Sequence, residues 1–421
     1  MQICGGPLEA EEGEKMNIAA AQSGGPTCAI NASLAGVFEA ASKSREIDKI
    51  YGCINGIEGV INDNLVELST IIKSNEDLEL LKLTPSTVLG SCRYKLPEND
   101  EKIYSKIVQT FKKNKIGMFF YIGGNDSMDT VVKLSDYFRK NDIDIKVVGI
   151  PKTIDNDLVC TDHTPGFGSA AKYVAATMQE IIRDSSVYSA KSVTIVEIMG
   201  RDAGWLAASS CILKANDENA PHLIYLPETP FSIERFMEDV RRMLVEHKAV
   251  VIAVSEGLKL SGGEYAAEDF QSGANDGFGH KYLSGIGKCL ENIVREQIGC
   301  KVRSIELNVM QRCASHIASK TDIDESEKIG EAAVAAALEG NTGKMMAFKR
   351  LSDRPYFTEI VPVDASEVAN KEKQFPKEWI NNQGNNVTAQ ALDYFLPLIQ
   401  GEQNVVMKNG MPVHFKIPNW F

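Results

Sequence analysis

Short apolar runs alternate along the chain with segments in which apolar residues recur at helical spacing. In the first such segment, Ile30, Leu34, Val37 and Phe38 follow one another at the intervals of a single helix face. The strand candidates are residues 16–22, 49–54, 116–122, 145–150, 193–198, 223–226, 250–254 and 301–310. Strands that alternate with helices predict an α/β fold, with parallel sheets covered by helices on both faces.

The length of the chain suggests how these elements are grouped. A single sheet of this many strands is possible, but 421 residues fit two domain-sized units better. We therefore expect two similar, Rossmann-like lobes that face each other across a cleft, with the active site in that cleft.

The densest polar cluster of the chain follows directly after one buried strand. The strand candidate 145–150 leads into the sequence Pro151-Lys152-Thr153-Ile154-Asp155-Asn156-Asp157. Polar groups just past the carboxyl end of a parallel strand are where α/β enzymes place their active sites. We interpret Asp155 as a general base and Lys152 as a cation that binds phosphate.

Two glycine turns stand between a strand and a helix, at Ser23-Gly24-Gly25-Pro26 and at Gly123-Gly124-Asn125-Asp126-Ser127. This arrangement offers backbone N–H groups and the positive end of a helix to a phosphate. A plain turn or a helix cap would explain either sequence alone. In the second turn, however, three oxygen-bearing side chains follow the glycines, which favours a phosphate and metal site. Arg93, in a loop rich in Gly and Ser, is a further phosphate candidate or simply a surface arginine.

Composition restricts the partners and the compartment. The net charge of −12 argues against a nucleic acid or an anionic membrane as partner. No apolar run approaches the roughly 18–20 residues of a membrane span. Nine cysteines without a CxxC pair indicate reduced thiols in a cytoplasmic protein. Residues 1–15 are acidic and lack an apolar signal region, so we expect a loosely ordered leader, with Met16 as an alternative start.

Taken together, the motifs resemble those of the phosphofructokinase family, in the family's order, over roughly residues 16–345. The glycine turns alone are shared with other kinases, whereas the run from Thr153 to Asp157 followed by Met199-Gly200-Arg201 is specific to the family. The other matching segments are Ser23–Pro26, Gly90–Arg93, Gly123–Ser127, Ser255–Gly257 and Gln311-Arg312.

The resemblance implies phosphoryl transfer to the 1-hydroxyl of fructose 6-phosphate. It assigns the catalytic roles to Asp155, Lys152, Asp126 and Arg201. It assigns sugar-phosphate binding to Thr153, Asp157, Met199, Gly200, Glu256, Arg303 and Arg312, the last two at the 6-phosphate. It assigns the phosphoryl donor to Gly24, Gly25, Arg93, Gly124 and Ser127.

The donor expected from the resemblance is pyrophosphate. Family members that use ATP have glycine where this chain has Asp126 and Lys152, and pyrophosphate users resemble this chain at both positions. A carboxylate at 126 would repel the α-phosphate of ATP, and Lys152 would neutralise the compact pyrophosphate. Ile54 and Ile57 stand where bacterial ATP users place an aromatic side chain against adenine.

The resemblance also implies Mg²⁺ and a homodimer or homotetramer. Asn125 stands where the family usually has a magnesium-binding aspartate, so we expect Asn125 and Asp126 to hold the ion together with pyrophosphate. Val309 replaces a His or Tyr that contacts the 6-phosphate in many members. Ser192, next to Lys191, replaces an arginine that some members supply across a subunit interface.

We expect a donor-binding lobe from residues 16–160 and about 275–320. Residues 161–274 and about 321–421 are expected to form the sugar-phosphate lobe and a C-terminal extension.

Three alternatives remain open at this point. They are an ATP-dependent member of the same family, a non-catalytic regulatory subunit of the same fold, and a dinucleotide-binding oxidoreductase. The second would be expected to lose the base or the cation, and both are present. The third is poorly supported, because the nearest glycine fingerprint, Gly166 to Ala171, follows Thr164-Pro165 rather than a strand.

Overall fold

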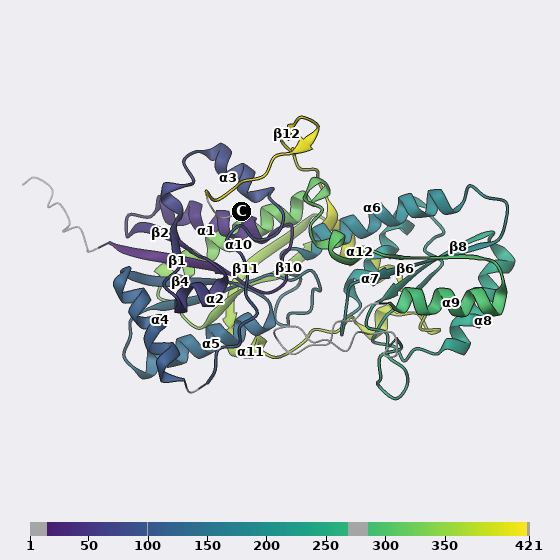
Figure 1. Cartoon of the computed structure of the whole chain (residues 1–421), viewed down its shortest axis with the longest axis horizontal. Helices are drawn as coiled ribbons and strands as arrows, with labels where there is room; N and C mark the ends of the chain where they lie inside the picture. Colours follow the sequence, from purple (N-terminus) through teal and green to yellow (C-terminus); the bar gives the residue numbers. More distant parts are fainter. Residues whose placement is uncertain (1–14, 99, 268–284, 419–421) are drawn as a thin grey trace, which may run out of the picture.

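The computed structural model describes residues 15–98, 100–267 and 285–418, and it has two lobes, each built on its own sheet (Figure 1). The first lobe holds a seven-stranded sheet with the strand order β11-β10-β5-β4-β1-β2-β3. The second holds a four-stranded sheet with the order β7-β8-β6-β9. The expected α/β fold of two lobes is therefore confirmed.

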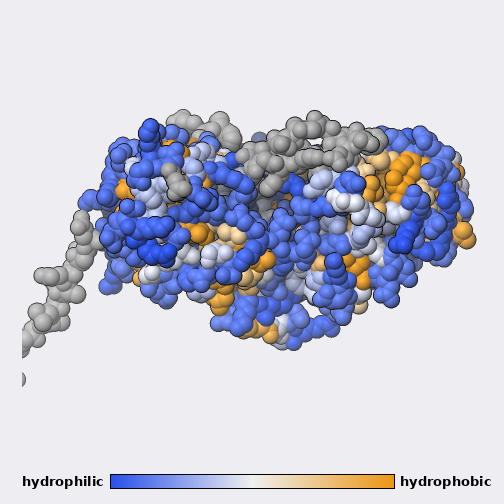
Figure 2. Space-filling view, turned by 90° about the horizontal axis from the view of Figure 1, so that it is seen from below, coloured by the Kyte–Doolittle hydropathy of each residue, from blue (hydrophilic) through white to orange (hydrophobic). Residues whose placement is uncertain are grey.

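In the first sheet, five neighbouring strands are parallel and one antiparallel strand closes each edge. The parallel strands are β1 (Met16–Gln22), β2 (Ile47–Cys53), β4 (Ile116–Gly123), β5 (Lys146–Pro151) and β10 (Lys344–Asp353), and the edges are β3 (Leu65–Glu67) and β11 (Tyr356–Asp364). The apolar runs of the sequence form the parallel strands because both faces of the sheet are covered. The face of the molecule seen in Figure 2 is, by contrast, mostly hydrophilic.

Helices cover both faces of this sheet. In β1, Ile18 and Ala20 belong to the core on one face, and Ala19 and Ala21 belong to the core on the other. The first face packs against α1 (Ile30–Lys43), α3 (Asn75–Lys82) and α10 (Lys320–Leu338). The second packs against α2 (Gly56–Ile61), α4 (Glu101–Lys113), α5 (Asn125–Lys140) and α11 (Ala365–Val368).

Helices α1 and α10 cross at very short distance, and glycines permit this contact. A Cβ atom on Gly36 would lie 1.9 Å from the carbonyl oxygen of Glu327, and one on Gly330 would lie 2.2 Å from that of Ser33. Because no side chain fits at either position, the backbones pack directly against each other. A helix from the late part of the chain is thereby fixed to the first helix of the first lobe.

The second lobe repeats the arrangement with a sheet that is parallel throughout. Its strands are β6 (Ser192–Ile198), β7 (Leu223–Tyr225), β8 (Ala249–Ser255) and β9 (Lys301–Glu306). One face packs against α6 (Phe167–Ser185), α7 (Trp205–Ser209) and α12 (Ala389–Phe395), and the other packs against α8 (Ile233–Glu246) and α9 (Ile286–Ile298).

The lobe boundaries expected from the sequence are wrong in two places. Strand β9 pairs with β6 and helix α9 packs on the same sheet, so residues 286–306 belong to the second lobe and not to the donor lobe. Strand β10 pairs with β5, so helix α10 and the hairpin β10–β11 belong to the first lobe. Hydrophobic patterning identifies a strand, but it does not say which sheet the strand joins. The leader expected at residues 1–15 lies outside the described residues, apart from Lys15.

After β11 the chain crosses to the second lobe and then returns. The ring of Trp205 in α7 lies 5.1 Å from the ring of Phe375 and 5.3 Å from that of Tyr394, centre to centre. Past the short strands β12 (Met407–Lys408) and β13 (Met411–Pro412), Phe415 and Ile417 are buried in the first lobe, near the end marked C in Figure 1. The C-terminal extension therefore connects both lobes. None of the described helices has the length and the apolar character needed to span a membrane.

A buried charged network in the chain that follows β5 contacts α10. The Nδ1 atom of His163 lies 2.9 Å from Asp162 Oδ2, and its Nε2 atom lies 2.8 Å from Glu325 Oε2. Burial alone would lower the pKa of His163, but the two carboxylates outweigh it and raise the pKa to about 9. The imidazolium is therefore a structural cation between two acids.

We predict that His163→Gln lowers the free energy of unfolding by roughly 3 kcal/mol near pH 6, and by much less near pH 10. The folded pKa lies above the ordinary value of 6.5, so the stabilisation is complete below pH 6.5 and disappears as the pH rises through about 9. Denaturant unfolding of both proteins across this range measures the difference. The exposed His316, changed to Gln, is the control. A difference that is the same at pH 6 and pH 10 would contradict the assignment.

Candidate active site

A cleft of about 630 Å³ lies between the lobes, at the carboxyl ends of the central strands of both sheets. Parallel strands bring the loops that follow them to one edge, and here two such edges face each other. The predicted residues that line the cleft are Gly24, Gly25, Arg93, Gly124, Asn125, Asp126, Ser127, Lys152, Thr153, Asp155, Asp157, Met199, Arg201, Glu256 and Arg312. The fold therefore brings together segments that lie far apart in the sequence.

On the side of the first lobe, three loops are joined by short hydrogen bonds. The hydroxyl oxygens of Ser23 and Ser127 lie 2.5 Å apart and connect the two glycine turns. The Gly24 N–H donates to the carbonyl of Cys92 at 3.1 Å, and the Ser91 hydroxyl donates to the carbonyl of Gly24 at 2.7 Å. The loop that carries Arg93 is thus fixed to the first turn, and residues of both turns line the same cleft.

Lys152 fills the space below these turns. Its ammonium group donates to the carbonyl of Gly25 at 2.6 Å, and the residue is only 2% exposed. Gly24 has a φ of +73°, and a Cβ atom on it would lie 3.3 Å from the Lys152 ammonium. Burial lowers the pKa of Lys152 to about 7, although the Asp155 carboxylate opposes the shift. An anion that enters this space would favour the charged ammonium.

Acids next to Lys152 also have displaced pKa values. Burial raises the pKa of Asp155, against the opposing charges of Arg201 and Lys152. Burial and the Asp155 charge together raise the pKa of Asp157 to about 7 and that of Glu256 to about 8. A carboxylate whose pKa is raised towards neutrality is suited to accept a proton from a hydroxyl.

Thr153 orients the candidate base. The Asp155 N–H donates to the Thr153 hydroxyl oxygen at 3.1 Å, and that hydroxyl lies 3.4 Å from Asp155 Oδ2. The short loop after β5 therefore holds its own carboxylate in place.

The second lobe contributes a cation and a carboxylate to the cleft. The N–H of Gly200 donates to Glu256 Oε1 at 3.3 Å, and the Ser255 hydroxyl donates to the carbonyl of Gly200 at 2.5 Å. Gly200 thus holds Glu256 in place without lining the cleft itself. The Nε atom of Arg201 is buried and has no hydrogen-bond partner among the described residues. A buried N–H without a partner is costly, so this guanidinium is suited to an anionic ligand.

Arg303, predicted to hold the 6-phosphate, lies outside the cleft of its own chain. It is on β9, where its Nη1 atom forms an ion pair with Asp184 Oδ2 at 2.9 Å, and its side chain is 44% exposed. The prediction is wrong for a site within one chain, because alternation along the strand directs this side chain to the surface.

Asn125 and Asp126 lie in the cleft as expected for metal ligands. The Asn125 amide nitrogen donates to the carbonyl of Lys371 at 2.5 Å, and its Oδ1 atom is buried without a hydrogen-bond partner in the described part of the chain. One oxygen of Asp126 lies 3.1 Å from the Lys95 ammonium. Among the described residues, no cluster of three or more His, Cys, Asp or Glu side chains forms a complete metal site. The two oxygens fit an ion that takes its other ligands from a bound phosphate or water.

Sequence reasoning missed several acids of the cleft. Glu197 and Glu306 are register partners near the carboxyl ends of β6 and β9, and Asp202 follows Arg201. An acid inside a buried apolar strand was a usable signal for Glu197. Glu372 lines the cleft from the C-terminal extension, and no motif marks it.

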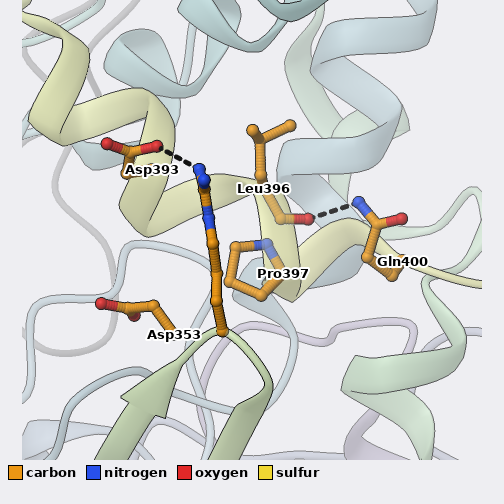
Figure 3. A pocket seen from close by; sticks show the side chains of 6 residues that line it. Asp353, Asp393, Leu396, Pro397 and Gln400 are labelled. Atoms are coloured by element: carbon orange, nitrogen blue, oxygen red, sulfur yellow. Dashed lines mark hydrogen bonds and ion pairs between the residues drawn. The ribbon is translucent and has the colours of Figure 1, made fainter.

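A second hollow, of about 530 Å³, lies between the end of β10 and the last residues of α12 with the segment that follows (Figure 3). Arg354 Nη2 and Asp393 Oδ1 form an ion pair in it at 3.0 Å, and the Gln400 amide donates to the carbonyl of Leu396 at 2.5 Å (Figure 3). None of the residues predicted for the site lines this hollow. The cleft between the lobes is therefore the candidate active site.

Comparison with known proteins agrees with this geometry. Residues 17–337 match the phosphofructokinase family model. The chain is 39% identical over 397 residues to the pyrophosphate–fructose 6-phosphate 1-phosphotransferase of Halomonas elongata, across 93% of this chain and 94% of that protein. The protein of the same name from Methylococcus capsulatus is 38% identical over 404 residues, across 95% of each chain.

A solved structure gives the same result. The crystal structure of the pyrophosphate-dependent phosphofructokinase from Marinobacter aquaeolei matches with a TM-score of 0.85 and 36% identity, over 96% of both chains. The resemblance inferred from the motifs is thereby confirmed, and the chain belongs to the phosphofructokinase family.

Proposed function

We infer that this chain is a pyrophosphate-dependent phosphofructokinase. It transfers a phosphoryl group from pyrophosphate to the 1-hydroxyl of fructose 6-phosphate and forms fructose 1,6-bisphosphate and phosphate. The observation that carries this conclusion is the presence of Lys152 and Asp126 in the cleft, beside the glycine turns. Similarity over more than nine-tenths of relatives that bear this activity in their names supports it.

Asp155 acts as the base in the transfer. The 1-hydroxyl oxygen attacks the terminal phosphorus of pyrophosphate, the bond to the bridging oxygen breaks, phosphate leaves, and the hydroxyl proton passes to Asp155. Phosphoryl transfer needs alignment and cations more than covalent chemistry, and Lys152, Arg201 and Arg312 supply the cations in the cleft. Because pyrophosphate and a sugar phosphate are of similar energy, the reaction runs in both directions.

The choice of donor follows from charge and space. Asp126 places a carboxylate in the second glycine turn, where the α-phosphate of ATP would have to lie. Ile54 and Ile57 are 5% and 0% exposed, so they pack in the core and do not form a surface for adenine. Pyrophosphate has neither an adenine nor an α-phosphate beyond this point, so it avoids both obstacles.

Mg²⁺ is the metal we assign to the donor side. Asp126 and the Oδ1 atom of Asn125 would hold it, with the remaining ligands from pyrophosphate and water. When bound, the ion neutralises charge on the pyrophosphate oxygens.

We assign Arg303 to the cleft of a second copy in a homodimer or homotetramer. Strand β9 is an edge of its sheet, and exposed apolar side chains lie near both of its ends. Tyr188, beside Lys301, is 55% exposed, and Met310, just past β9, is 58% exposed. An exposed edge strand with apolar neighbours favours association of copies.

We also propose a cytoplasmic location. The cysteines of the described residues are all free thiols, and most of them are buried, which suits a reducing compartment.

We predict that the purified chain forms fructose 1,6-bisphosphate from fructose 6-phosphate with pyrophosphate at least about 100-fold more efficiently than with ATP. An aldolase-coupled assay that offers each donor separately measures both rates. Robust turnover with ATP and none with pyrophosphate would identify an ATP-dependent enzyme. No turnover with either donor would identify a non-catalytic subunit.

We predict that Asp155→Ser reduces turnover by about 100-fold to 10,000-fold, because the hydroxyl proton loses its acceptor. Binding of fructose 6-phosphate, measured by calorimetry, should remain. The control is Asp144→Ser, which changes an exposed acid just before the same strand. Undiminished turnover in Asp155→Ser would remove Asp155 from the role of base.

We predict that Asp126→Gly combined with Lys152→Gly lowers kcat/KM for pyrophosphate by about 100-fold or more, because the donor loses its buried cation. The control is Asp144→Ala with Lys146→Ala, which removes an Asp–Lys pair at the opposite end of β5. Steady-state kinetics with pyrophosphate and with ATP measure kcat/KM for each donor in both double variants. Pyrophosphate kinetics equal to those of the control would refute the specificity assignment.

A further inference from the structure

The residues that follow β11, here called the C-terminal extension, lie beyond the residues 17–337 that match the family model. They nevertheless contact the loop after β5 at several points. This loop carries Asp155 and Asp157 and is here called the catalytic loop. The segment 371–375 runs beside the loop that follows β5. The Lys373 N–H donates to the carbonyl of Asp157 at 2.6 Å, and Leu158 forms a β-bridge with Glu372. The backbone of the extension is thus paired with the backbone of the catalytic loop at residues 157 and 158.

Asn156 is the residue of the loop that the extension holds most closely. It stands between Asp155 and Asp157, is fully buried, and has a φ of 54°, in the left-handed region. Its Nδ2 atom donates to the hydroxyl of Tyr394 at 2.9 Å, and its Oδ1 atom accepts from the Lys373 ammonium at 3.3 Å. Both ends of the amide are therefore bound by side chains of the extension.

These two side chains are fixed in turn by the backbone beyond the loop. The Tyr394 hydroxyl donates to the carbonyl of Asp162 at 2.7 Å. The Lys373 ammonium donates to the same carbonyl at 2.7 Å and to that of Thr161 at 3.1 Å. Asp162 also contacts His163, so the contacts of Asn156 lead through the extension to the buried charged network of His163.

The same segment reaches the other two parts of the cleft. The carbonyl of Lys371 accepts from the Asn125 amide in the second glycine turn at 2.5 Å. The carbonyl of Lys373 accepts from the Trp205 indole N–H in the second lobe at 3.0 Å. One short piece of chain therefore connects the donor turn, the catalytic loop and the sugar lobe.

We propose that Lys373 and Tyr394 are positioning residues for the phosphoryl transfer, which hold Asn156 in the left-handed turn that directs Asp155 and Asp157 into the cleft. The proposal rests on the proposed function, in which Asp155 is the base. A base displaced by about 1 Å loses roughly 100-fold in rate even when both substrates still bind. Loss of these contacts should therefore reduce kcat and leave the KM values nearly unchanged.

The test compares Tyr394→Phe and Lys373→Met with two matched controls in the full-length protein. Tyr356→Phe removes a hydroxyl that donates to Glu325, in the same network but without contact to Asn156. Lys377→Met removes an exposed lysine side chain four residues after Lys373. We expect kcat to fall about 10-fold to 100-fold in the two test variants, with KM for both substrates within about threefold of wild type. The controls should retain kcat within about twofold.

Hydrogen exchange of the backbone amides at residues 153–158 gives a second result that does not depend on turnover. We expect exchange there to be faster in Tyr394→Phe than in Tyr356→Phe, because only the former frees Asn156. If wild type shows no turnover with pyrophosphate, the proposed function fails. The exchange data then still show whether Tyr394 holds Asn156 and the catalytic loop in place.

Two outcomes would overturn the proposal. One is a kcat in Tyr394→Phe and Lys373→Met that equals the kcat of the controls, with unchanged exchange. The other is an equal loss of kcat in the test variants and in Tyr356→Phe, which would indicate general loosening of the network. If Lys373→Met does not fold, Tyr394→Phe decides alone, because it removes a single oxygen atom.

Discussion

The cleft depends on charged groups that are held where water is scarce. Lys152 is almost fully buried, and the pKa values of Lys152, Asp157 and Glu256 are all displaced towards the neutral forms. Burial of charge is costly unless an opposite charge compensates it. Pyrophosphate and a sugar phosphate bring negative charge, so their binding favours the charged ammonium of Lys152. The site is therefore suited to its complex, because among the described residues an N–H of Arg201 and an oxygen of Asn125 have no hydrogen-bond partner.

Much of this site could be predicted from the sequence because its groups follow strands directly. Lys152 and Asp155 directly follow a buried strand. The parallel pairing of that strand brings both residues to the edge of the sheet where the active site lies. The same reasoning found Arg201 and Glu256 at the ends of β6 and β8. The division into two lobes, each with its own sheet, was also predicted correctly, because 421 residues fit two domain-sized units better than one.

The features of the fold and the site that could not be predicted are those that depend on contacts between distant parts of the chain. Strand β9 carries the same apolar signal whichever sheet it joins, so its residues were expected in the wrong lobe. Arg303 was assigned to the 6-phosphate by the family resemblance, and its side chain does not line the cleft of its own chain. Lys373 and Tyr394 have no motif, and a lysine and a tyrosine at separate points of a C-terminal extension look like ordinary surface and core residues. Their relation to Asn156 exists only in the folded chain. Such positions become visible only from hydrogen-bond geometry.

The order of strands in the larger sheet has a consequence for synthesis on the ribosome. Strands β10 and β11 complete that sheet beside β5, yet almost the whole second lobe lies between β5 and β10 in the sequence. The first lobe therefore emerges first but remains unfinished, with one side of β5 exposed until residue 344 and beyond has been made. The second lobe is almost continuous in sequence and gains its full sheet earlier. Because an unpaired apolar strand invites aggregation, the nascent chain is most vulnerable along β5 during this interval.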